Sequence, residues 1–104
     1  YKDLKNLNMD NDLIILKQAK LALFTIDVKY KMSGFNEKKK LIKAREAAFS
    51  AYALEHLELI EEGVKCTQKD IDEMKKIRDE IKKAADTQTL IQGVVRLTSF
   101  LINL

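Results

Sequence analysis

One stretch decides the fold, and it occupies residues 36–62: NEKKKLIKAREAAFSAYALEHLELIEE. It contains neither proline nor glycine, so no residue in it interrupts a helix. Gly34 before it tolerates the backbone turn that ends a preceding helix, and Asn36 can accept hydrogen bonds from free amides as an N-cap. Gly63 marks its end. The stretch therefore predicts one long helix around which the rest of the chain packs.

This long helix is apolar on two sides. The broader face carries large side chains at helical spacing: Leu41, Ile42, Ala48, Phe49, Tyr52, Leu59 and Ile60. The second face carries Ala44, Ala47, Ala51 and Leu54, whose small members would let another backbone approach closely. A helix with two apolar faces is more often central than peripheral. We expect Phe49 and Tyr52 to be heavily buried.

Two polar residues interrupt the broader face, Arg45 and His56. We expect the stem of Arg45 to pack on the core with its guanidinium in solvent. For His56 we expect a partly buried ring bonded to a carbonyl or carboxylate, with a pH-sensitive contact as the alternative.

The charges of the long helix run against its dipole, and each such placement costs about 0.3–1 kcal/mol. Its first turns hold Lys38, Lys39, Lys40 and Lys43, and its last turns hold Glu55, Glu58, Glu61 and Glu62. An anion, a neighbouring helix of the same chain or a second copy would compensate them. The four lysines are the candidate anion-binding residues. The candidate interface of an antiparallel homodimer comprises Ala44, Ala47, Ala51, Glu58, Glu61 and Glu62.

The rest of the chain predicts three further helices, so that the four span about 12–33, 36–62, 68–85 and 87–103. Residues 1–11 are polar, and we expect a loosely ordered arm docked by Leu4, Leu7 and Met9 before a single helical domain at 12–104. Residues 25–32 alternate between polar and apolar, which leaves open a strand at the end of the first helix.

The third and fourth helices have clear apolar stripes. In the third, Thr67 is the predicted N-cap with Asp70 as its reciprocal partner, and the stripe comprises Ile71, Met74, Ile77, Ile81 and Ala84. In the fourth, Leu90, Val94, Leu97, Leu101 and Leu104 form a heptad seam, which predicts a core helix or, alternatively, one inserted into a partner or a lipid interface. Gly93 inside the seam costs about 1 kcal/mol relative to alanine.

Composition agrees with an all-α, four-helix bundle. The chain has 104 residues, enough for one domain, with no proline and three glycines. Its formal net charge is +3, but residues 29–45 carry seven basic groups and one acidic group, whereas residues 46–66 carry one basic and five acidic groups. The molecule is therefore expected to have a basic corner and an acidic one.

No motif in the chain carries catalytic chemistry, and we expect no enzyme. One histidine and one cysteine are too few for a metal site of nitrogen and sulfur ligands, so neither a metal nor a cofactor is expected. The single cysteine, Cys66, excludes an internal disulfide and favours a reduced thiol in the cytoplasm. No apolar run is long enough to span a membrane.

The sequence thus favours a small protein-interaction domain, acting as a regulatory, adaptor or assembly subunit through its apolar helix faces. Its partner would be a second copy, in an antiparallel dimer, or another protein. The alternative is an anion-binding module whose basic corner at residues 29–45 contacts nucleic acid or acidic lipid.

Overall fold

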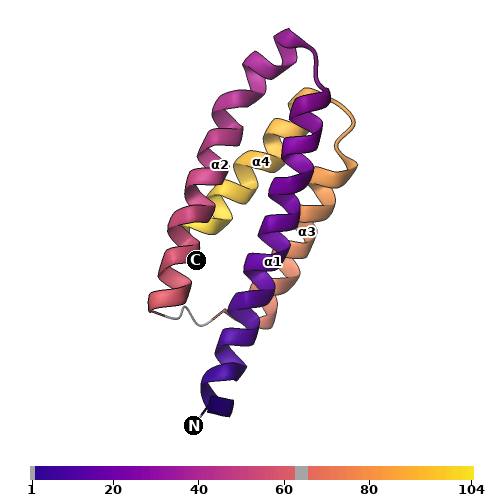
Figure 1. Cartoon of the computed structure of the whole chain (residues 1–104). Helices are drawn as coiled ribbons and strands as arrows, with labels where there is room; N and C mark the ends of the chain where they lie inside the picture. Colours follow the sequence, from indigo (N-terminus) through magenta and orange to yellow (C-terminus); the bar gives the residue numbers. More distant parts are fainter. Residues whose placement is uncertain (1, 63–65) are drawn as a thin grey trace.

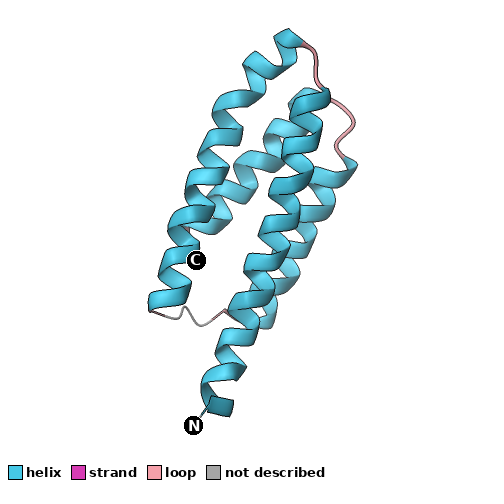
Figure 2. Ribbon diagram, in the orientation of Figure 1, coloured by secondary structure: helices cyan, strands magenta, loops and turns pink. Residues whose placement is uncertain are grey.

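The structure, a computed structural model, describes residues 2–62 and 66–104, with the backbone alone for residues 2–10. Its helices are α1 (Lys2–Met32), α2 (Phe35–Glu61), α3 (Gln68–Lys83) and α4 (Thr87–Ile102). They run in alternating directions along one long axis (Figure 1). Figure 2 shows helices joined by short connections, with no strand among the described residues. The predicted all-α, four-helix bundle is confirmed.

Helix α1 begins earlier than the sequence predicts, and its last residues, where a strand was left open, are helical. It starts at Lys2 and not near residue 12, so the backbone of the expected arm continues the helix. A helix that is already nucleated gains one hydrogen bond for each residue added, which favours this extension. The docking expected for Leu4, Leu7 and Met9 lies outside the described side chains. At the other end, α1 stays helical through Met32, so the alternation at 25–32 does not mark a strand.

The core lies between the helices; α1 contributes six of its buried apolar residues, and α2, α3 and α4 contribute four each. Helix α2 packs against α1 and α4, and within the described part of the chain it does not touch α3. The predicted stripes of the last two helices are confirmed as core. The buried apolar residues are Ile15, Leu16, Ala19, Ala22, Leu23 and Ile26 of α1, Leu41, Ala48, Ala51 and Leu59 of α2, Ile71, Met74, Ile77 and Ile81 of α3, and Leu90, Val94, Leu97 and Leu101 of α4, together with Cys66.

Helix α2 is less central than the sequence predicts. Phe49 is 38% exposed and Ile60 is exposed, so the expectation of heavy burial is wrong for Phe49, while Tyr52 is half-buried. Because α2 touches two helices and not three, only a narrow strip of it enters the core. That strip comprises Leu41, Ala48, Ala51, Glu55 and Leu59.

The helix caps agree with the sequence in α3 and differ in α2. Thr67 and Asp70 form the predicted capping box, and Asp86 accepts a hydrogen bond from the Thr89 amide at 2.8 Å. The N-cap of α2 is Gly34, which offers no side chain to the first amides, whereas Asn36 lies inside the first turn. The predicted stop at Gly63 lies outside the described residues.

Gly93 allows α4 to approach α3 closely. A Cβ atom placed on Gly93 would lie 3.0 Å from Cγ1 of Ile81, whose side chain is fully buried. The glycine that weakens the helix prediction therefore has a packing role between these two helices.

Candidate interaction surface

The basic corner predicted at residues 29–45 divides into paired and unpaired groups. Lys29 donates to the carbonyl oxygens of Ile81, Lys82 and Ala84 at 2.8–2.9 Å and so closes the end of α3. Burial lowers the pKa of Lys29. These contacts give Lys29 a structural role.

Arg45 also has a structural role, in place of the solvated head group expected from the sequence. Its Nε lies 3.1 Å from Oδ1 of Asp27, and its guanidinium lies 4.9 Å from the ring centres of both Tyr30 and Phe49. Hydrogen bonds from Arg45 and then from Lys31 lower the pKa of Asp27. This cluster joins α1 to α2 and accounts for two further basic groups of the corner.

The four candidate anion-binding lysines remain. Among the ion pairs between described residues, none involves Lys38, Lys39, Lys40 or Lys43. Lys38 and Lys39 lie over the rings of Tyr30 and Phe35, at 5.8 and 5.4 Å from the ring centres. A hollow of about 190 Å³ is lined by these two lysines, the two aromatic rings and Ile42. The structure thus brings Lys38 and Lys39 to one aromatic-walled hollow, while Lys40 and Lys43 are exposed further along α2.

The candidate interface residues fall into two groups. Ala51 belongs to the core and Ala44 packs against it, so these two serve the fold of their own chain. Ala47 is exposed, and so are the three acids of the candidate interface, Glu58, Glu61 and Glu62. These acids take part in none of the ion pairs found between described residues.

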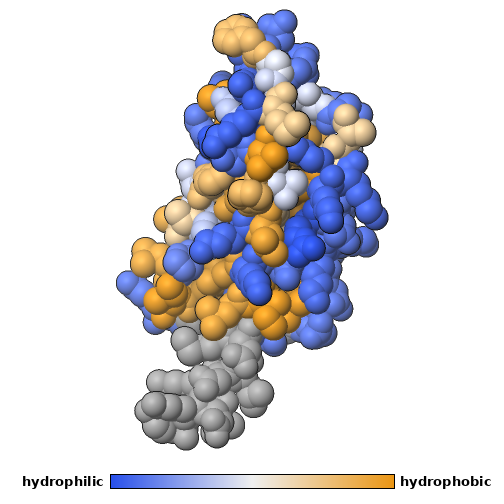
Figure 3. All heavy atoms as spheres, turned by 45° about the vertical axis from the view of Figure 1, so that its right-hand side comes forward, coloured by the Kyte–Doolittle hydropathy of each residue, from blue (hydrophilic) through white to orange (hydrophobic). Residues whose placement is uncertain are grey.

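An apolar surface that the sequence only partly indicated runs along α1. We call it the α1 outer face, and it comprises Leu13, Ile14, Leu21, Phe24 and Val28, all exposed. Phe24 is 68% exposed, and Ile14, Leu21 and Val28 recur every seven residues. Figure 3 shows apolar surface in the lower and central parts of the molecule. Hydrophilic side chains interrupt it and cover the right side of the view. The signal was present in the sequence, because Leu13, Leu21 and Phe24 lie off the main stripe of their helix.

Helix α2 extends this apolar surface at its edge. Leu13 of α1 and Ile60 of α2 line the same small hollow, together with Asp12, Leu16 and Leu59. Exposed apolar side chains therefore continue from one helix to the next.

The single histidine lies at the surface, contrary to the partly buried position expected. His56 is exposed and stacks on Tyr52, with ring centres 5.7 Å apart and ring planes 7° from parallel. The pH-sensitive contact that was the alternative stays a prediction.

Two buried carboxyl groups lie at the end of the bundle where α3 begins. The Cys66 amide donates to Oδ1 of Asp12 at 3.1 Å, and Asn11 donates to the Cys66 carbonyl at 2.9 Å. Asp12 and Glu55 are 3% and 5% exposed, and Oδ2 of the former and Oε1 of the latter have no hydrogen-bond partner among the described atoms. Burial, followed by Glu58 and Asp12, raises the pKa of Glu55.

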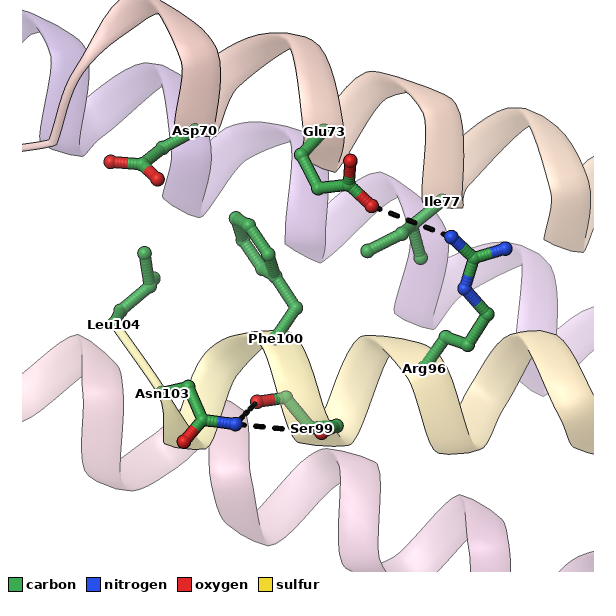
Figure 4. A pocket seen from close by; sticks show the side chains of 8 residues that line it. All are labelled: Asp70, Glu73, Ile77, Arg96, Ser99, Phe100, Asn103 and Leu104. Carbon is green, nitrogen blue, oxygen red and sulfur yellow. Dashed lines mark hydrogen bonds and ion pairs between the residues drawn. The ribbon is translucent and has the colours of Figure 1, made fainter.

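A hollow of about 290 Å³ lies between α3 and α4 and is lined by charged, polar and apolar side chains (Figure 4). Arg96 reaches from α4 to Glu73 at 3.4 Å and also pairs with Glu80. Phe100 stands between the two helices, and Asn103 donates to the Ser99 carbonyl at 2.8 Å. Arg96 and Glu73 are thus paired with each other, and Asp70 accepts a hydrogen bond from the Thr67 hydroxyl.

Other kinds of site are absent from the described residues. They contain no group of three His, Cys, Asp or Glu side chains that could hold a metal ion. No helix within them combines the length and the apolar character needed to cross a membrane.

Compared with known protein families, with curated proteins and with solved structures, the chain shows no match. The fold and the surface therefore define the class: a small all-helical bundle with exposed apolar and charged helix flanks.

Proposed function

We propose that this protein is a small non-enzymatic interaction domain that binds other proteins and associates with itself, as a regulatory, adaptor or assembly subunit. The observation that carries the proposal is the α1 outer face, where five large apolar side chains lie exposed along one helix. Complete burial of a side chain such as Phe24 contributes about 1.5–3 kcal/mol. Covering this face with a partner would therefore be favourable.

Self-association in an antiparallel dimer is the second part of the proposal. It is supported by the lysines at the start of α2 and the glutamates at its end, which form no ion pair with any side chain that the structure describes. The competing account, in which another helix of the same chain neutralises these charges, finds no ion pair to support it among the described residues. A cytoplasmic location belongs to the same proposal, because the single, buried Cys66 thiol suits a reducing compartment.

The test separates partner binding from folding. Phe24→Ser on α1 should leave circular dichroism unchanged and should abolish retention of whatever protein co-purifies with the wild type. Ile102→Ser on α4 is the matched control, since the two side chains are 68% and 67% exposed and Ile102 lies on neither surface of the proposal. Equal retention by the wild type and Phe24→Ser would remove the α1 outer face from the proposal.

A second candidate function is anion binding, favoured by the hollow in which Lys38 and Lys39 meet two aromatic rings. The wild type should then bind nucleic acid or anionic vesicles at about 50 mM salt and lose them as salt rises. Changing Lys38, Lys39, Lys40 and Lys43 to Gln should flatten this salt dependence. No binding by the wild type at low salt would contradict this second candidate.

A further inference from the structure

One exposed flank of α2 has a spacing that reads the same in both directions. Its members are Lys40, Lys43, Ala47, Leu54, Glu58 and Glu61, all exposed. Successive members are separated by three, four, seven, four and three residues. Steps of three, four and seven keep side chains on one face of a helix, as in the seam of a coiled coil. We call this flank the α2 seam.

The two halves of the α2 seam are also opposite in chemistry. When two copies of a helix lie antiparallel, a step forward along one is a step backward along the other. The residue numbers of each facing pair therefore add up to the same sum. For a sum of 101, Lys40 meets Glu61, Lys43 meets Glu58 and Ala47 meets Leu54. Every member of the seam then has a complementary partner: a base opposite an acid, or a small side chain opposite a large one.

We infer that two copies of this protein associate through the α2 seam, antiparallel and in the register that places Lys40 opposite Glu61. The two-fold axis passes between Ser50 and Ala51, so each of the three pairs occurs twice. The proposal rests on the self-association proposed above and adds its surface and its register. It leaves the α1 outer face of each copy free for a different protein.

Three observations make the α2 seam available for this contact. Leu54 is 66% exposed, which is unfavourable for the isolated chain. The lysines and glutamates of the seam form no ion pair in the described part of the chain, so their charges are free to pair with a second copy. Helix α2 also runs along one margin of the elongated molecule, where a second long helix can lie beside it (Figure 1).

The structure also corrects the composition of the interface suggested by the sequence. Ala44 and Ala51 pack in their own core, so the close approach depends on Ala47 opposite Leu54. The pair of a small and a large side chain fills space that two leucines would overfill. Leu54 is thus the apolar anchor of the contact, and the charged pairs at both ends determine direction and register.

Cysteine cross-linking tests the register directly. Cys66 is buried and is changed to Ser in all variants, so that each chain carries one cysteine. A mixture of the variants Ala47→Cys and Leu54→Cys should form a disulfide-linked heterodimer under mild oxidation. Ser50→Cys, beside the axis, should cross-link to itself. Ala47→Cys alone is the matched control: two such residues would lie seven positions out of register, roughly 10 Å apart along the axis, and should not cross-link.

Charge reversal provides a second, independent measurement by sedimentation. Glu58→Lys with Glu61→Lys should weaken self-association roughly 10- to 100-fold at low salt, because attractive pairs become repulsive ones. Adding Lys40→Glu and Lys43→Glu to the same chain should restore it. Lys75→Glu with Lys76→Glu, on the charged surface of α3, should leave it unchanged.

The outcomes separate this inference from the function on which it rests. Suppose that the protein dimerises but that Ala47→Cys cross-links only to itself, or that none of these positions cross-links. The proposed register is then wrong, while self-association stands. A wild type that sediments as a monomer at high concentration and low salt overturns both, and leaves only the binding of another protein.

Discussion

At the residue scale, Glu55 is a carboxyl group in an unfavourable place, because it is buried in the core. The sequence places it in a run of acids at the end of the long helix, yet it is buried beside Asp12 with one oxygen unbonded. Whether a position on α2 faces the core depends on where α1 and α4 cross it. Sequence spacing could not supply that information, because apolar residues occur on more than one face of this helix.

Glu55 predicts an unusual dependence of stability on pH. Burial raises its pKa above the unfolded value of about 4.3, so its proton is held more tightly in the folded state. Its contribution is therefore present in full below about pH 4 and is lost as pH rises through the folded pKa. We expect the midpoint of urea unfolding to increase when the pH is lowered from 7 to about 5.

Glu55→Gln should abolish this increase and stabilise the protein at pH 7 by about 1 kcal/mol, since an amide can donate to Asp12 without carrying charge. Glu61→Gln, at an exposed position of the same helix, is the control and should keep the wild-type profile. Below about pH 4 the sign reverses, because Asp27 and Asp86 have lowered pKa values and their contributions are lost as they become protonated. A wild type whose stability falls steadily from pH 7 to pH 5 would contradict the role given to Glu55.

At the element scale, the existence of all four helices could be predicted because helical spacing is a local property of the sequence. Ile71, Met74, Ile77 and Ile81 lie on one face whatever surrounds them. The exposed flank of α2 could not be predicted, because apolar residues occur on both of its sides and only the neighbouring helices select one. The N-cap differs for a similar reason: Gly34 and Asn36 are two residues apart, and the structure begins α2 between them.

Gly93 predicts a packing effect that outweighs helix propensity. Gly93→Ala should gain about 1 kcal/mol in propensity but should place a methyl group against the buried Ile81 side chain. We expect net destabilisation of about 1–2 kcal/mol, measured by urea unfolding. In an Ile81→Ala background, which removes the obstructing atom, the same change should become stabilising. A Gly93→Ala chain that is more stable than the wild type would show that α3 moves aside.

Lys29 predicts that α3 is held at its end by a residue of α1. Lys29→Met keeps most of the stem and removes three hydrogen bonds to carbonyl oxygens. The protein should lose about 1–3 kcal/mol of stability, and the last turn of α3 should exchange its amide hydrogens faster. Lys20→Met is the control, since Lys20 is exposed, lies on the same helix and takes part in none of the ion pairs between described residues. Equal effects of the two changes would mean that charge, and not the carbonyl contacts, is responsible.

At the scale of the whole molecule, the candidate site could be predicted in part. The charge run identified four lysines, and these are the ones that remain unpaired among the described basic groups of the corner. Their availability depends on Asp27, which pairs with Arg45 and Lys31 across two helices. No local sequence pattern shows which basic groups Asp27 pairs with. The α1 outer face was equally hard to predict, because an apolar side chain is counted as core until the positions of its neighbours are known.

The same arrangement predicts that assembly and folding respond differently to salt. The bundle is held by extensive apolar packing, which salt does not screen, whereas the α2 seam combines one kind of apolar contact, at Leu54, with exposed ion pairs. Raising salt from about 50 mM to about 1 M should convert dimers to monomers in sedimentation while circular dichroism stays constant. A dimer that persists at high salt would indicate an apolar interface, and the α1 outer face would then be the surface to test.

Asn11 and Asp12 hold the backbone of Cys66 by hydrogen bonds, so the reactivity of this cysteine reports local opening of the bundle. The thiol is buried, and burial followed by Asp12 raises its pKa, so a thiol reagent reaches a reactive thiolate only when this end of the bundle opens. The labelling rate of the unmodified chain therefore measures how often α1 releases the start of α3. Asn11→Ala should accelerate labelling several-fold, in line with a hydrogen bond worth about 1 kcal/mol, with little change in global stability. If labelling follows global unfolding in both chains, the two ends of the bundle open as one unit.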